Sequence, residues 1–247
     1  MKLVYSIAYL CSLILSVLWA LPAAAQENDA SLRGLWNGFQ GQLNVVECLR
    51  GRLAGEAGRA DFALVLRDSD GAEIRRQPFS LEQNGTEHLI LNNLINVADR
   101  YGSYEVDAVS PSSASYFCHT AVYRMGHHNA PPEYAYSLPM LAPTADSTSG
   151  IFNSLHPDPG QTLVYTWLTL INPEEVSISL DVQLFDQLGN PLETIVVPDL
   201  PAGARRDIPL HAGGPRLGLY KVRSTNGQQY ISYATRFAPE RNGFSFA

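Results

Sequence analysis

The sequence is poor in cysteine, holds only one long apolar run and lacks the short motifs of common enzymes. It contains no G-x-S-x-G nucleophile turn, no H-E-x-x-H zinc motif, no C-x-x-C pair and no glycine-rich phosphate loop. We therefore expect no catalytic residue, no metal ligand and no cofactor. Hydrolases that use paired carboxylates carry no short motif, so this class stays as a less favoured alternative.

The chain also lacks an excess of positive charge. Its 24 acidic residues outnumber its 17 lysines and arginines, which gives a net charge of −7 at pH 7. Nucleic acids and anionic membranes attract proteins through clustered Lys and Arg. This balance argues against both as partners and favours a protein or a glycan.

The single long apolar run lies near the N-terminus. It covers residues 7–21, follows Lys2, and precedes Pro22 and the small residues 23–25. These features are typical of a signal peptide over residues 1–25, cleaved before Gln26. An uncleaved membrane anchor is the alternative, but the run is short for a span. We expect export to the periplasm, the cell surface or the medium, with no membrane span after cleavage.

Two cysteines remain after loss of the leader, Cys48 and Cys118. In an oxidising compartment they are expected to form one disulfide, which would close a loop of 70 residues. Two buried free thiols are the alternative.

The clearest pattern in the mature chain is a strict alternation of apolar and polar residues. The apolar positions are Val176, Ile178, Leu180, Val182 and Leu184. A period of two predicts a half-buried β-strand, here followed by a turn over residues 186–189.

Much of this pattern occurs a second time, 118 residues earlier, over residues 61–73. The match continues at constant offset to Ile90 and Ile208, so that Asn84-Gly85 falls on Ala202-Gly203. About seven short strands per copy, separated by turns, predict an all-β protein with two tandem immunoglobulin-like β-sandwich modules. The predicted divisions are a signal peptide (1–25), a first module (26–124), a proline-rich connector (125–150) and a second module (151–247). Apolar residues 134–141 of the connector are expected to pack along one module as an edge strand.

The second copy resembles secreted bacterial β-sandwich repeats of cell-surface and extracellular proteins. The resemblance is carried by residues 167–173 (WLTLINP), the alternating strand, Asp186…Gly189, residues 200–203 (LPAG) and residues 218–222 (GLYKV). It implies a module type and an exported location, and it transfers no catalytic residue.

Aromatic residues are the main candidates for ligand binding. The set comprises Trp36, Trp167 and the tyrosines at 101, 104, 116, 123, 220, 230 and 233. Rings on one outer face would suit a sugar, whereas rings that recur at the same module position favour packing. A carbohydrate-binding accessory protein is therefore the alternative function.

Other polar clusters have ordinary explanations. Asp68, Asp70 and Glu73 could bind calcium, but a polar hairpin turn is the favoured explanation. His127-His128 would point to opposite faces of a strand and so would rarely share a metal. The short runs Arg75-Arg76 and Arg205-Arg206-Asp207 are interpreted as charged sheet edges, which block unwanted strand pairing. The favoured hypothesis is a non-catalytic, exported structural or interaction protein that acts through surface or edge-strand contacts.

Overall fold

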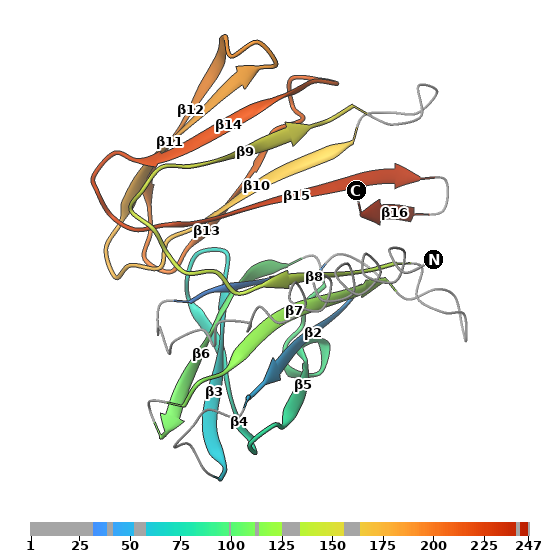
Figure 1. Ribbon diagram of the computed structural model, residues 1–247, viewed down its shortest axis with the longest axis vertical. Coiled ribbons are helices and arrows are strands. Elements are labelled where there is room, and N and C mark those ends of the chain that lie inside the picture. Colours follow the sequence, from blue (N-terminus) through green and yellow to red (C-terminus); the bar gives the residue numbers. More distant parts are fainter. Residues whose placement is uncertain are drawn as a thin grey trace, which may run out of the picture.

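The computed structural model describes residues 32–38, 42–51, 58–98, 100–111, 114–124, 134–155, 164–240 and 243–246. These residues form sixteen strands and one short helix, arranged as four antiparallel sheets in two stacked modules (Figure 1). The all-β, tandem β-sandwich prediction is confirmed. The predicted signal peptide lies outside the described residues. Within them, no helix has the length and apolarity needed to cross a bilayer.

The first module contains two four-stranded sheets, ordered β1-β6-β3-β4 and β5-β2-β7-β8. Its elements are β1 (Gly34–Asn37), β2 (Gln42–Leu49), β3 (Ala60–Asp68), β4 (Glu73–Leu81), β5 (Thr86–Ile90), α2 (Leu91–Leu94), β6 (Tyr101–Ser110), β7 (Phe117–Arg124) and β8 (Tyr134–Pro139).

The second module repeats this topology strand for strand. Its strands are β9 (Thr148–Asn153), β10 (Tyr165–Ile171), β11 (Ile178–Asp186), β12 (Pro191–Leu200), β13 (Arg205–Pro209), β14 (Leu217–Ser224), β15 (Ile231–Glu240) and β16 (Gly243–Phe246). The sheet orders β12-β11-β14-β9 and β13-β10-β15-β16 match those of the first module, with each label advanced by eight. The repeat therefore has eight strands, one more than the sequence predicted. The additional strand of the first module, β8, lies inside residues 125–150 and pairs with β7 at the edge of its sheet, which confirms the edge strand expected in residues 134–141.

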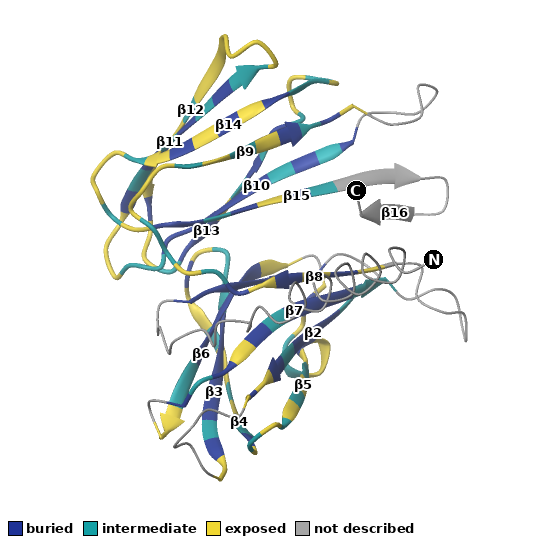
Figure 2. Cartoon of the chain, viewed as in Figure 1, coloured by how far each residue is buried: buried dark blue, intermediate teal, exposed yellow. Residues whose placement is uncertain are grey.

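The alternating strands supply the two sandwich cores. In β11, the side chains of Ile178, Leu180, Val182 and Leu184 are fully buried, while the residues between them remain partly exposed. In β3, Phe62, Leu64 and Leu66 occupy the same positions in the first core. Figure 2 shows these buried central strands between more exposed edge strands.

The constant offset between the copies breaks at a bulge in β12. Leu180 pairs with Val197 and Ile178 with Leu200, so β12 uses one residue more than β4 at this point. Beyond the bulge the offset is 119, and Asn84 corresponds to Gly203. Both have positive φ, 61° and 69°, in turns closed by equivalent hydrogen bonds. The alignment of Asn84-Gly85 with Ala202-Gly203 is thus wrong by one residue.

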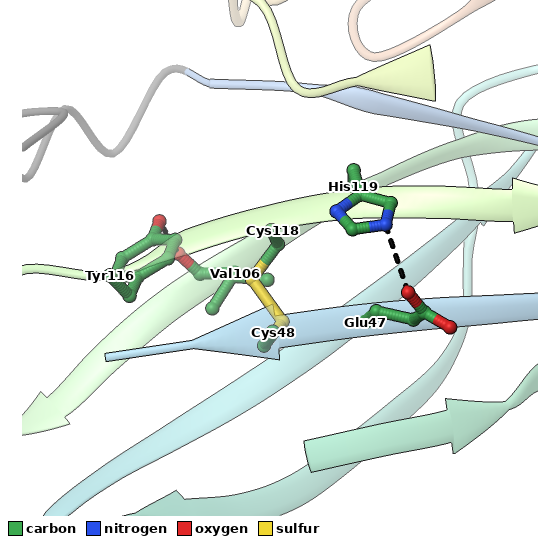
Figure 3. The surroundings of a disulfide bond; sticks show 6 residues. All are labelled: Glu47, Cys48, Val106, Tyr116, Cys118 and His119. Carbon is green, nitrogen blue, oxygen red and sulfur yellow. Dashed lines mark hydrogen bonds and ion pairs between the residues drawn. A yellow bond between two sulfur atoms is a disulfide. The ribbon is translucent and has the colours of Figure 1, made fainter. Parts of the chain in front are cut away.

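The disulfide joins Cys48 and Cys118, which face each other in register on neighbouring strands β2 and β7 (Figure 3). This confirms the predicted pair. In the second module the equivalent pair is Leu170 and Ser232. Tyr116 lies two residues before Cys118, and its hydroxyl donates to the carbonyl of Val106 at 2.6 Å. Such a tyrosine corner is typical of immunoglobulin-like sandwiches, and Tyr230 repeats it in the second module.

The two modules share a buried junction. Its apolar part comprises Leu35, Val122, Tyr136 and Leu138 from the first module and Ile171, Ile231 and Tyr233 from the second. The Tyr233 hydroxyl donates to the carbonyls of Arg33 at 2.6 Å and Pro139 at 2.8 Å. Burial raises the pKa of Tyr233 well above its usual value, so the phenol stays protonated as a donor. These contacts join the two modules through buried apolar and hydrogen-bonded groups.

Arg205 closes the polar part of the junction. Its guanidinium donates to the carbonyls of Trp36 and Gly102 and to Asn37 Oδ1 at 2.8–3.0 Å. It also pairs with Asp207 Oδ2 at 2.9 Å, and its side chain is only 3% exposed. The interpretation of Arg205 as an exposed edge charge is therefore wrong, because β13 turns this side chain toward the first module. Its neighbour Arg206 is exposed, as expected.

Candidate functional site

A groove of about 340 Å³ opens on one side of the second module, between β12 and β13. These strands are the terminal strands of the two sheets, so the groove lies where the sandwich is open at its edge. Its apolar wall contains Ile195, Val196, Val197, Pro198, Ile208, Pro209 and Ala212, and its polar residues are Glu193, Arg206, Asp207 and Arg216.

The groove exists because the second module lacks large side chains that the first module has on this side. Phe79 of β4 packs in the first core, and its counterpart in β12 is the smaller Val197. After β5, the segment with α2 contributes Leu94 and Ile95 to the same core. The corresponding segment after β13 is shorter and contains Ala212-Gly213-Gly214. With these side chains missing, the edge of the second sandwich is left unfilled.

The two equivalent edge strands differ in their protection against strand pairing. In β4, Pro78 lacks an N–H group, and Arg75 and Arg76 place charges on the edge. Arg76 is fixed by Glu73 at 3.1 Å and Asp107 at 2.6 Å. Prolines and charged side chains are common protection for sheet edges. The prediction that Arg75-Arg76 forms a charged edge therefore fits the position of both residues on β4.

Strand β12 lacks this protection along its centre. Between Pro191 and Pro198 it carries a single charge, Glu193, and no basic residue. Leu192 and Val196 are 45% and 62% exposed. Among the described residues, β12 pairs only with β11, so the backbone groups on its other side are available. The central part of this edge, between its two prolines, thus has mainly apolar side chains and lies beside the apolar wall of the groove.

Most of the aromatic candidates are packing residues. Trp36, Tyr104, Tyr116, Tyr230 and Tyr233 are all buried. Trp36 donates its indole N–H to the carbonyls of Arg67 and Ser103, which ties β1 to the sheet. The recurrence of tyrosines at equivalent positions therefore reflects the shared fold, as the packing alternative proposed.

One aromatic group lies elsewhere, on the outer face of the sheet that contains β10. Tyr165 and Trp167 are two residues apart on β10 and both are partly exposed. The His211 ring contacts both, with centroid distances of 4.9 Å to Tyr165 and 5.1 Å to Trp167. Trp167 is not part of the second core, because the inward positions of β10 belong to Leu168 and Leu170.

A polar cluster lies on one face of a sheet in the first module. Glu47 of β2 accepts from His119 Nε2 at 2.9 Å, and Tyr123 donates to it at 3.3 Å (Figure 3 shows the Glu47–His119 pair). His88 lies 3.6 Å from the same carboxylate. All four lie on neighbouring strands, so the cluster is a cross-strand network beside the disulfide.

The candidate calcium ligands form a turn instead. Asp68 Oδ1 accepts from the N–H groups of Asp70 and Ala72 at 3.1 and 3.0 Å. Asp186 accepts the same two bonds in the second module, from the N–H groups of Leu188 and Asn190. The side-chain amide of Asn190, together with these backbone bonds, lowers the pKa of Asp186. Within the described residues, no three His, Cys, Asp or Glu side chains are grouped to hold a metal. The pair His127-His128 lies outside the described residues.

The carboxylates at the junction bind arginines. Glu105 pairs with Arg33 and with Arg67 at 2.7 Å, and Asp207 pairs with Arg205. The hydrolase alternative required two acidic side chains facing each other between the modules. Neither of these two carboxylates has that arrangement.

No family model and no curated protein matches the chain. Among solved structures, the N-terminal CBM22-1–CBM22-2 tandem domain of Xyn10C from Paenibacillus barcinonensis is 9% identical, with a TM-score of 0.18, covering 85% of this chain and 79% of that one. The structure of the infectious bursal disease virus Gx strain is 11% identical, with a TM-score of 0.17, covering 81% of this chain and 56% of that one. With TM-scores this low, neither likeness bears on function. The resemblance to secreted bacterial repeats stays a prediction.

Proposed function

We propose that the protein is a non-catalytic, exported interaction protein that binds an extended segment of a partner by strand addition at β12. The observation that supports this most directly is the difference between equivalent edges. The first module places Pro78 and two arginines along β4, whereas the part of β12 between Pro191 and Pro198 has Glu193 as its one charge and lies beside a groove. Strand addition needs free backbone groups for affinity and pockets for alternate side chains for specificity.

The bound segment would extend the sheet β9-β14-β11-β12 by one strand. Alternate side chains of such a strand point to opposite faces of the sheet. One set would enter the groove beside Ile195, Val197 and Ile208, and the other would lie on the opposite face of the sheet. The buried junction would hold β12 in a fixed orientation relative to the first module.

Substitution Val196→Lys is expected to weaken binding by about tenfold or more, because a charged side chain on an edge opposes strand pairing. The measurement uses segments selected from a random peptide library on the immobilised protein, followed by titration of each segment. The selected segments should alternate apolar and polar residues.

The matched control is Val176→Lys, since Val176 is 54% exposed in the same module but lies in the turn before β11. This variant should bind as the parent does. If Val196→Lys and Val176→Lys bind the selected segments equally well, strand addition at β12 is wrong.

The aromatic group on the outer face favours a second candidate function, glycan binding. Tyr165 and Trp167, bridged by His211, would supply the stacking surface. Under this hypothesis Trp167→Ala abolishes retention on an oligosaccharide array, while Phe117→Ala, which alters an exposed aromatic–histidine pair in the first module, leaves it unchanged. Absence of retention by the parent protein would exclude this candidate.

A further inference from the structure

The polar residues of the groove differ in how firmly they are held. Asp207 is bound by Arg205 and accepts from the Thr169 hydroxyl at 2.7 Å. Arg216, in contrast, has a carboxylate partner only at 3.9 Å, Glu193, whose side chain is 53% exposed. The ion pairs of Arg205 and Arg223 with aspartates measure 2.9 Å. Arg216 is therefore a groove cation without a close counter-charge.

The guanidinium of Arg216 is also poorly satisfied in hydrogen bonds. Its Nε is buried and has no hydrogen-bond partner in the described part of the protein. Its Nη2 reaches the carbonyl of Leu210 only at 3.4 Å. The group lies over the Phe152 ring, 5.5 Å from the centroid, so its plane is supported on one side. Buried polar groups are normally hydrogen-bonded, and an arginine fork suits a carboxylate.

Gly213 makes room for this position. A Cβ at residue 213 would overlap the Arg216 guanidinium. Gly213 is not in the left-handed region, so its backbone conformation would accept alanine. The absence of a side chain at Gly213 thus allows the guanidinium to line the groove.

The first module contains a natural comparison. Arg100 occupies the equivalent place, because the carbonyls of Arg100 and Arg216 accept equivalent bonds from Gly38 and Ser154. Arg100 is exposed to solvent, whereas Arg216 lines the groove. The same residue therefore has different surroundings in the two copies, and the difference coincides with the groove.

We propose that Arg216 anchors a carboxylate of the segment bound along β12, so that the partner is an extended apolar segment bearing an acidic side chain or ending in a free C-terminus. This rests on the proposed strand addition. The apolar walls would take alternate side chains, and Arg216 would fix the register of the strand by pairing with its carboxylate. Arg206, exposed at the same groove, adds positive charge to the approach.

The test uses random segments displayed in two formats, internally in a scaffold and with a free C-terminus. Arg216→Gln is expected to bind the selected segments at least tenfold more weakly, and Arg216→Lys to recover part of the loss. Amidation of the segment's carboxylate should weaken binding to the parent by the same factor and leave binding to Arg216→Gln unchanged. Selection in the internal format identifies an acidic side chain, and selection only with free ends identifies a C-terminal carboxylate.

Arg100→Gln is the matched control and should bind as the parent does. Gly213→Ala keeps the charge but displaces it, so it should lose binding as Arg216→Gln does, with an unchanged melting temperature. A different result would be segments that bind Arg216→Gln and Gly213→Ala as they bind the parent, yet bind Val196→Lys weakly. That result would contradict the role of Arg216 as an anchor and would still support strand addition at β12. If no selected segment responds to Val196→Lys, both proposals fail.

Discussion

An Arg205→Met variant is expected to lose about 3 kcal/mol of folding free energy, although methionine fills much of the same volume. Removal of one partner from a buried charged network leaves the others without compensation. Here Asp207 would lose its cation, and the carbonyls of Trp36 and Gly102 would lose their donor. The free energy of unfolding, measured by urea titration with tryptophan fluorescence, gives the size of the loss.

The control for this prediction is Arg206→Met, one residue along β13, where the side chain is exposed and substitution should change stability by less than about 0.5 kcal/mol. Equal stabilities of the two variants would show that the junction does not depend on Arg205.

The second large effect is expected from the Cys48→Ala/Cys118→Ala double substitution. The bond closes a 70-residue loop, and the chain-entropy relation gives a loss of roughly 4 kcal/mol on its removal. The loss should affect the first module, because the second module has Leu170 and Ser232 at the equivalent positions. Urea titration with and without a reducing agent measures it.

Reduction of the parent protein should lower its stability to that of the double variant, while the double variant should be insensitive to the reducing agent. A parent protein whose stability is the same when reduced would contradict a stabilising role for this disulfide.

The regular parts of the fold were predictable from local pattern. The alternation from Val176 to Leu184 led to β11, and its repetition led to β3 and to two similar modules. The cysteine pair was predictable because only two cysteines follow the predicted leader. These features depend on side chains whose periodicity or number is visible in the sequence.

The features that were predicted wrongly depend on how strands pair and how the two modules pack together. The bulge in β12 shifts the alignment of the two copies by one residue after Val197, and no single residue type in the sequence indicates this bulge. The burial of Arg205 depends on how the second module meets the first, because the same Arg-Arg-Asp run would suit an exposed edge.

The groove was not predicted because it results from side chains that are missing. A signal was nevertheless available in the repeat itself. The second copy has smaller side chains on one side: Val197 in place of Phe79, and the glycine pair 213–214 in place of Leu94-Ile95. Comparing the copies for size, as well as for pattern, would have indicated an unfilled edge.

The central claim is that β12 is the edge to which a partner strand binds. Hydrogen exchange of the full protein, with and without a library-selected segment, tests this most directly because strand addition protects backbone amides. The account predicts slower exchange within residues 192–197 on binding and no change in β4, residues 73–81. Protection confined to β10 around Trp167, with β12 unchanged, would contradict it.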